Sequence, residues 1–148
     1  MAKRSAGLLL YRRRPDLEVF LVHPGGPFWK NKDEGAWSIP KGEYAEGEEP
    51  LAAALREFEE ETGTKPDGAF VPLGEIRQAG GKIVTAWAVE GDLDEAAIRS
   101  NTFTVELPRG SGRMVEFPEV DRAAWYPLAE ARRKILSGQI DLLDRLVG

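Results

Sequence analysis

The chain has 148 residues, with 20 lysines and arginines against 25 aspartates and glutamates, one histidine, no cysteine and 42% apolar residues. This profile is typical of one folded domain, and the lack of cysteine excludes disulfides, thiolate metal sites and a cysteine nucleophile. A net charge of −5 argues against polyanion binding over the whole surface, although a phosphate ligand can use a local basic patch or a bound cation.

The first third of the chain predicts a β-hairpin followed by a long loop. Ser5 to Arg13 and Leu17 to His23 are apolar or β-rich runs, and Arg14-Pro15-Asp16 between them has turn chemistry. Pro24-Gly25-Gly26-Pro27 then breaks regular structure, and Ala36 to Ile39 resumes an extended course. We expect the loop between them to be functional because of its length.

The segment from Pro50 to Thr62 predicts a helix. Proline suits the first helical turn, and Gly63 suits the position just past the helix end. An α-helix turns by about 100° per residue, so three carboxylates of this segment share one face and an apolar stripe lies on another. The carboxylates are Glu57, Glu60 and Glu61, and the stripe expected to face the core is Leu51, Leu55, Phe58 and Thr62.

The rest of the chain predicts short strands and two closing helices. The strand-like segments are Ala69 to Gln78, Lys82 to Val89, Thr102 to Leu107, Met114 to Phe117 and Ala123 to Tyr126. The helices are expected from Leu128 to about Leu136 and from Gln139 to Leu146. No repeat or linker interrupts the chain, so we predict one α/β domain over residues 1–148 with a single mixed sheet.

The three helix carboxylates are unfavourable for one another, since like charges at this spacing repel by a few tenths of a kcal/mol per pair. A bound divalent cation would reverse that effect, and carboxylate oxygens together with water suit Mg²⁺ or Mn²⁺. An acidic helix face is more often only a solvated stripe. The flanking residues therefore decide between the two interpretations.

Those flanking residues form a spaced pattern. Gly42 is followed after five residues by Glu48 and after seven more by Arg56-Glu57-Phe58-Glu59-Glu60-Glu61-Thr62-Gly63. This pattern resembles the Nudix box of the Nudix hydrolases, and its one departure is Thr64, where the family usually has an aliphatic residue. The resemblance implies the Nudix fold, in which a mixed β-sheet is sandwiched between helices.

The resemblance also implies residue roles around a metal site. It gives Glu57, Glu60 and Glu61 as ligands of divalent metal, one of them acting as the base, and the backbone carbonyl of Lys41 as another ligand. It gives Arg56, Glu48 and Gly42 supporting roles, with Arg56 and Glu48 orienting the ligands through an ion pair. A further glutamate ligand is expected ahead of Trp125, where Glu119 fits and Glu116 is a close rival.

Several residues suggest the substrate. Trp37-Ser38-Ile39-Pro40-Lys41-Gly42 resembles the segment before the box in Nudix enzymes that act on dinucleoside polyphosphates, inositol pyrophosphates and nucleoside triphosphates. The Lys41 ammonium can pair with a polyphosphate oxygen, and Trp29 can stack on a nucleobase. Tyr44 and Arg12 are further candidate contacts. A structural or solvated role stays open for each, and Trp87, Trp125 and His23 are expected to be structural.

We therefore expect hydrolysis of a phosphoric anhydride bond in a nucleoside polyphosphate, most directly a dinucleoside polyphosphate or a nucleoside triphosphate, with Mg²⁺ or Mn²⁺ as cofactor. The alternatives are an ADP-ribose or nucleotide-sugar pyrophosphatase and a non-catalytic nucleotide sensor. The acidic balance disfavours nucleic-acid partners, RNA caps included. The apolar runs are too short to span a bilayer, so we expect a cytoplasmic protein, and a homodimer is common in the family.

Overall fold

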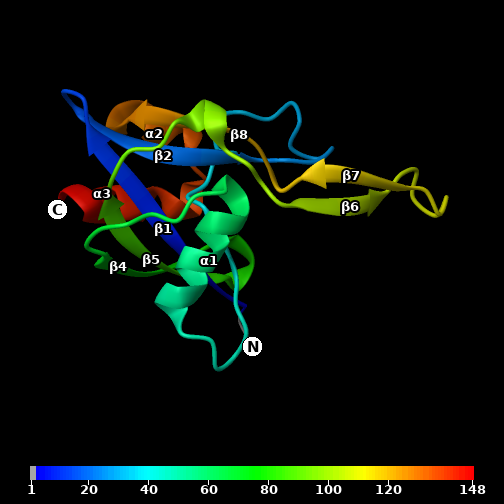
Figure 1. The fold of residues 1–148 in the computed structure, drawn as a ribbon, viewed down its shortest axis with the longest axis horizontal. Helices are drawn as coiled ribbons and strands as arrows, with labels where there is room; N and C mark the ends of the chain where they lie inside the picture. Colours follow the sequence, from blue (N-terminus) through cyan, green and yellow to red (C-terminus); the bar gives the residue numbers. More distant parts are fainter. Residues whose placement is uncertain (1–2) are drawn as a thin grey trace.

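The computed structural model describes residues 3–148 (Figure 1). Its strands are β1 (Arg4–Arg13), β2 (Leu17–Pro24), β3 (Lys41–Glu43), β4 (Val71–Arg77), β5 (Ile83–Glu90), β6 (Thr102–Glu106), β7 (Met114–Pro118) and β8 (Val120–Pro127). Its helices are α1 (Pro50–Thr62), α2 (Leu128–Lys134) and α3 (Ile140–Val147), with short 3₁₀ turns η1 (Ala79–Gly81), η2 (Glu95–Ala97) and η3 (Ser137–Gln139). None of the helices in these described residues is long and apolar enough to cross a membrane.

The main sheet is mixed, as the sequence predicts. Its strand order is β4-β5-β1-β2-β8, with β3 paired to β1, and among these strands of residues 3–148 only the β1–β5 pair is parallel. The predicted hairpin is confirmed, since Arg13 pairs with Leu17 across the turn between β1 and β2.

The segment that carries Lys41 opens the sheet between β1 and β2. Beyond the hairpin end, β1 leaves β2 and pairs with β3 through Ser5 to Gly7, while Val22 of β2 bridges to Ser38. The Leu8 amide donates to the Pro40 carbonyl at 3.1 Å in the same gap. Residues 38–43 therefore lie in the middle of the molecule rather than on a peripheral loop.

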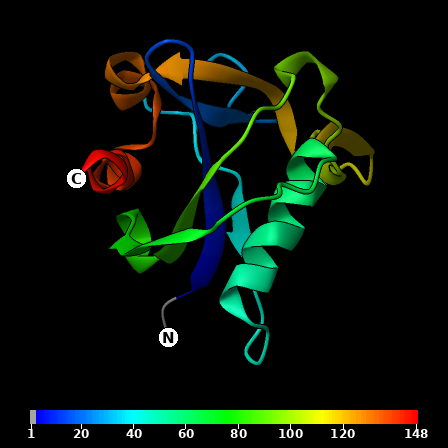
Figure 2. The ribbon, with the colours of Figure 1, turned by 60° about the vertical axis from the view of Figure 1, so that its left-hand side comes forward.

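Helices cover both faces of the sheet (Figure 2), which confirms the predicted layers. Alternate side chains of β1 serve the two faces, because successive residues of a strand point to opposite sides. Leu8 and Leu10 pack with Ala54 and Phe58 of α1, whereas Leu9 packs on the α2 and α3 side. Trp87 and Trp125 pack against the α1-side cluster, as expected.

The ends of α1 coincide with the prediction. Pro50 occupies the first turn, and Gly63 takes the left-handed φ of 80° that ends the helix, with its N–H donating to the Glu59 carbonyl at 2.8 Å. The expected separation of an apolar face from an acidic face is wrong, however. Leu51 and Leu55 are only half-buried, while the fully buried Ala53 and Ala54 allow a close approach to the sheet. In consequence Glu61 turns inward and is only 9% exposed.

Two of the predicted strands lie outside the main sheet. In residues 3–148, β6 and β7 pair only with each other, and they project from the domain as a two-stranded arm (Figure 1). Phe103 faces Phe117 across this arm, with ring centroids 6.1 Å apart. The expectation of one sheet is wrong here: β6 and β7 satisfy their ladder hydrogen bonds in each other rather than at the edge strands β4 or β8 of the main sheet.

Candidate active site

Arg56 is the centre of an ion-pair network on α1. Its Nε and Nη2 donate to the two carboxylate oxygens of Glu48 at 2.9 and 3.1 Å, and its Nη1 donates to Glu57 at 3.0 Å and to Glu60 at 3.1 Å. The hydrogen bonds from Arg56 lower the pKa of Glu48. A two-pronged contact of this kind fixes direction as well as distance, so it ties the loop before α1 to the carboxylate face of the helix.

Glu57 lies against the backbone of β3. Its side chain is 12% exposed, and a Cβ added to Gly42 would lie 2.1 Å from the Glu57 carboxyl carbon. Only glycine allows this approach without moving the glutamate. Burial and the nearby charge of Glu60 raise the pKa of Glu57, against the lowering effect of Arg56.

Glu61 and Lys41 form the most buried part of the site. Burial raises the pKa of Glu61 well above its ordinary value, and the charges of Glu57 and Glu119 add to this shift. The ammonium of Lys41 and a backbone hydrogen bond from the same residue oppose it. Burial in turn lowers the pKa of Lys41. These groups share a poorly solvated space, where charge interactions are strong.

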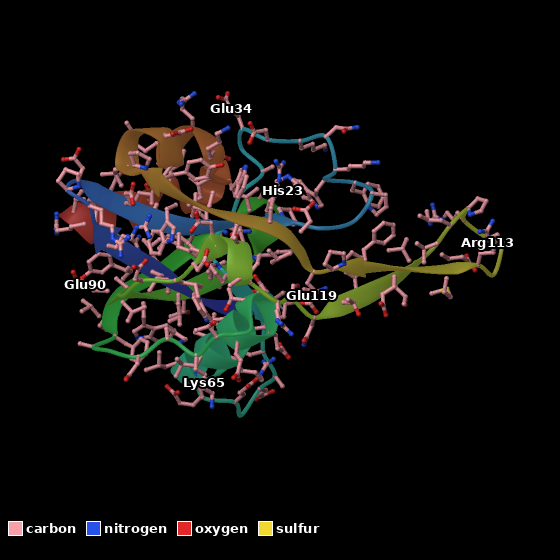
Figure 3. The ribbon with its side chains drawn as sticks, turned by 45° about the horizontal axis from the view of Figure 1, so that its top comes forward. His23, Glu34, Lys65, Glu90, Arg113 and Glu119 are labelled. Atoms are coloured by element: carbon pink, nitrogen blue, oxygen red, sulfur yellow. The ribbon has the colours of Figure 1, made fainter. Side chains whose placement is uncertain are left out.

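A chain of backbone hydrogen bonds places Glu119 beside α1. The Asn101 amide donates to the Glu60 carbonyl at 2.7 Å, and the Glu119 amide donates to the Asn101 carbonyl at 2.8 Å. Figure 3 shows Glu119 at the base of the β6–β7 arm and Arg113 near its tip. Burial and the charge of Glu60 raise the pKa of Glu119. The rival Glu116 is exposed along β7, so the structure brings Glu119 to the cluster.

The donor chemistry of this cluster fits a divalent cation. Glu57, Glu61 and Glu119 bear oxygen donors whose mutual repulsion raises the pKa of Glu61, and a cation is what relieves such repulsion. As the side chains stand, no three histidine, aspartate or glutamate side chains of residues 3–148 converge into a metal-holding group. Arg56 Nη1 instead contacts Glu57 and Glu60 together.

A cavity of about 340 Å³ adjoins the carboxylates. It combines the charged Lys41, Lys82, Glu61 and Glu119 with Trp29 and with apolar and neutral polar walls. Those walls are Val22, Pro24, Ala36, Ser38, Ile39, Gln78, Val120 and Leu136. The cavity therefore offers cationic groups for an anionic ligand and apolar surface for an uncharged one.

The loop that carries Trp29 is anchored by hydrogen bonds from His23 and Trp37. His23 is fully buried, and its Nε2 donates to the Lys32 carbonyl at 2.6 Å. Trp37 Nε1 donates to the Asp33 carboxylate at 2.9 Å. His23 therefore has the structural position expected of it, and the loop presents Trp29 to the cavity from a fixed base.

The structure does not bring two of the predicted substrate contacts to the cavity. Arg12 pairs with Glu18 at 2.8 Å and Asp92 at 2.7 Å, and its guanidinium lies 4.0 Å from the Trp125 ring centroid. Tyr44 packs against the α1-side core cluster. Conversely, the sequence reasoning missed Gln78 and Lys82, which flank the β4–β5 turn and lie in no motif.

Comparison with known proteins places this geometry among related folds. The family model described as NUDIX domain matches residues 1–146. Curated relatives include an RNA pyrophosphohydrolase of Roseobacter denitrificans, 40% identical over 62 residues that span 39% of each chain. Another RNA pyrophosphohydrolase, from Brucella anthropi, is 29% identical over 90% of this chain and 87% of its own.

The solved structures show the same fold at low identity. An Ap4A hydrolase of C. elegans in a binary complex has a TM-score of 0.68 and 21% identity, covering 97% of this chain and 95% of its own. The NUDIX domain of Shewanella oneidensis NrtR, complexed with ADP ribose, has a TM-score of 0.69 and 18% identity, covering 99% of this chain and 87% of its own.

Proposed function

Because this chain belongs to the Nudix family and is a pyrophosphohydrolase of that family, we propose that it hydrolyses a nucleoside polyphosphate with the help of Mg²⁺ or Mn²⁺. The first candidate substrates are dinucleoside polyphosphates and nucleoside triphosphates. The observation that carries this proposal is the carboxylate cluster around the buried Glu61, next to a cavity that also contains Lys41 and Lys82.

Each group of the site has a part in this proposal. Glu57, Glu60, Glu61, Glu119 and the Lys41 carbonyl would hold the metal, which supplies an activated water and neutralises phosphate charge. The ammonium groups of Lys41 and Lys82 pair with phosphate oxygens. One of the carboxylates Glu57, Glu60 and Glu61 would also accept the proton of the attacking water. Trp29 stacks on the base.

The test is a substrate panel with the purified protein in Mg²⁺, in Mn²⁺ and in EDTA. The panel contains diadenosine and diguanosine tetraphosphates, ATP, GTP, ADP-ribose, a sugar nucleotide and a 5′-triphosphorylated RNA oligonucleotide, with products separated by chromatography. We expect metal-dependent cleavage of the free nucleoside polyphosphates. Cleavage of ADP-ribose alone would mean that the substrate is ADP-ribose and not a nucleoside polyphosphate. No cleavage of any compound by folded protein would favour a nucleotide-sensing role.

RNA is a second candidate substrate, because two curated relatives are named RNA pyrophosphohydrolases. A 5′-triphosphate end carries the same anhydride bonds as a nucleoside triphosphate, so the same carboxylates and lysines serve both. The net charge of −5 weighs against a long RNA footprint. Faster cleavage of the triphosphorylated oligonucleotide than of GTP and ATP would assign RNA as the substrate.

A further inference from the structure

A fully buried glutamine links the cavity wall to the interior of the domain. Gln139, at the end of η3, has no exposed surface. Its Oε1 accepts from the Ile39 amide at 3.0 Å, and its Nε2 donates to Ser38 Oγ at 3.0 Å and to Gln78 Oε1 at 2.8 Å. Ile39 is buried too, so its amide needs this acceptor.

The direction of every hydrogen bond in this network is fixed by the Ile39 amide. A backbone N–H only donates, so Gln139 must turn its oxygen toward Ile39 and its NH₂ group toward Ser38 and Gln78. Gln78 must then present its own oxygen to Gln139. The NH₂ group of Gln78 has no acceptor within residues 3–148, and Gln78 lines the cavity. The Gln78 oxygen faces the buried Gln139, so the NH₂ group is the part of this amide left for a ligand in the cavity.

Other contacts hold Gln78 in this arrangement. Its backbone closes the β4–β5 turn, where its amide donates to the Lys82 carbonyl at 2.7 Å. Gly138 packs so closely that an added Cβ would lie 3.2 Å from Gln78 Cα and 3.3 Å from its Cγ. The Ser38 hydroxyl donates to the Ile39 carbonyl at 2.6 Å, so its proton is already engaged. If the Gln78 amide rotated to exchange its oxygen and nitrogen, its NH₂ group would face the NH₂ group of Gln139, and neither group could accept a hydrogen bond.

We propose that Gln78 determines base specificity by selecting a 6-oxopurine over adenine, and that Gln139 is the positioning residue that sets the polarity of the Gln78 amide. A glutamine recognises adenine by donating to N7 while accepting from the 6-amino group, whereas guanine offers two acceptors, N7 and O6, on the same edge. Because the Gln78 oxygen faces the buried Gln139, the NH₂ group is the end of the amide left for a base, and its two hydrogens match the two acceptors of guanine but oppose the 6-amino donor of adenine. This inference rests on the proposed function for the nucleoside polyphosphate itself and adds the identity of its base.

The wild-type protein provides the first test. We expect kcat/KM for GTP to exceed that for ATP by about tenfold to a hundredfold, the usual size of discrimination by one good bidentate contact between a side chain and a base. Inosine triphosphate, which shares O6 and N7 but lacks the 2-amino group, should behave like GTP. Calorimetric binding of GMP and AMP in metal-free buffer measures the same preference without turnover. An equal or reversed preference in both measurements overturns the proposal.

Two variants separate Gln78 from Gln139. Gln78→Met keeps the side-chain size and removes the donors, so the guanine preference should vanish. Gln139→Glu offers oxygens only, so Gln78 should turn its NH₂ inward and its oxygen to the cavity, which shifts the preference toward adenine without changing Gln78. An unchanged preference in Gln139→Glu would remove the positioning role.

The outcomes also separate this inference from the proposed function. Tighter binding of GMP than AMP without any hydrolysis would overturn the function and keep the base inference. Hydrolysis of GTP and ATP at equal kcat/KM, unchanged in Gln78→Met, would support the proposed function and overturn the base inference. Thermal unfolding of each variant shows whether it is folded, and Gln78→Met decides the matter alone if Gln139→Glu does not fold.

Discussion

Glu59 and Glu60 are neighbours on α1, yet they have different surroundings. Glu59 is exposed, whereas Glu60 contacts Arg56 Nη1 at 3.1 Å and its charge contributes to the raised pKa of Glu57 and Glu119. We predict that Glu60→Gln lowers kcat by about 10²–10³-fold, because a metal held without this carboxylate would stabilise the developing phosphate charge less well. The measurement is steady-state hydrolysis of the best substrate in the panel.

Glu59→Gln is the matched control for that prediction. It makes the same chemical change one residue away, on the exposed side of the helix, so both activity and thermal stability should stay near the wild-type values. If Glu60→Gln kept most of the wild-type activity, the assignment of Glu60 to the metal site would have to be withdrawn.

Asp33 predicts a pH-dependent contribution to stability. The hydrogen bonds from Lys134 and Trp37 lower its pKa below the ordinary 3.8. A carboxyl whose pKa is lowered by folding stabilises the folded state above the unfolded pKa, and this contribution is lost as pH falls through the folded pKa. Asp33→Asn should therefore lower the stability at pH 7 and have a diminishing effect below about pH 3.8.

Urea unfolding of wild type and Asp33→Asn at a series of pH values measures this difference. Glu34, the exposed neighbour that pairs with Arg133 at 3.0 Å on the surface, gives the control variant Glu34→Gln, for which we expect only a small change. A difference between wild type and Asp33→Asn that persists unchanged at pH 2.5 would contradict the assigned role of the Asp33 charge.

At the scale of elements, the sequence predicts structure well where local chemistry determines it. The ends of α1 follow from Pro50 and from the left-handed Gly63, which act within a few residues of the chain. Phe103 and Phe117 alternate with polar residues as strand residues do, but that pattern carries no information about which strand becomes the partner. The strands were therefore predictable and their separation into an arm was not.

The same distinction applies to the site. Helical geometry and the box spacing allow the proximity of Glu57, Glu60 and Glu61 to be predicted from the sequence, because all three lie on one helix. Gln78, Lys82 and Gln139 meet the cavity or its wall only through the packing of η3 against the β4–β5 turn. Such contacts join residues far apart in the chain, and no period or motif marks them.

The β6–β7 arm predicts unequal stability within the molecule. A lone two-stranded hairpin is marginally stable in water, and Met114 and Phe103 on this arm are exposed. We expect the amides of β6 and β7 to exchange with deuterium through local opening, much faster than those of β1, whose exchange should need global unfolding. Hydrogen-exchange mass spectrometry reads both elements in one experiment. Equal protection of the arm and β1 would show that the arm is covered in solution.

At the scale of the whole molecule, the sheet separates two core clusters that serve different purposes. Phe58 of α1 packs 6.2 Å from Phe20 between ring centroids and holds the helix that carries the carboxylates. Leu142 of α3 is equally buried on the opposite face of the sheet. A change in either cluster weakens folding, but only the α1-side cluster packs directly against the helix that carries the three box carboxylates.

Phe58→Leu and Leu142→Ala test this division. Leu142→Ala should lower the free energy of unfolding by about 3 kcal/mol through the cavity it leaves, with kcat unchanged while the protein is folded. Phe58→Leu should cost about 1–2 kcal/mol and lower kcat by about tenfold or more, because small displacements of catalytic groups are expensive. Urea denaturation and steady-state kinetics on the same preparations measure both quantities. A loss of kcat in Leu142→Ala as large as that in Phe58→Leu would mean that the sheet transmits strain from one face to the other, and that the whole core positions the carboxylates.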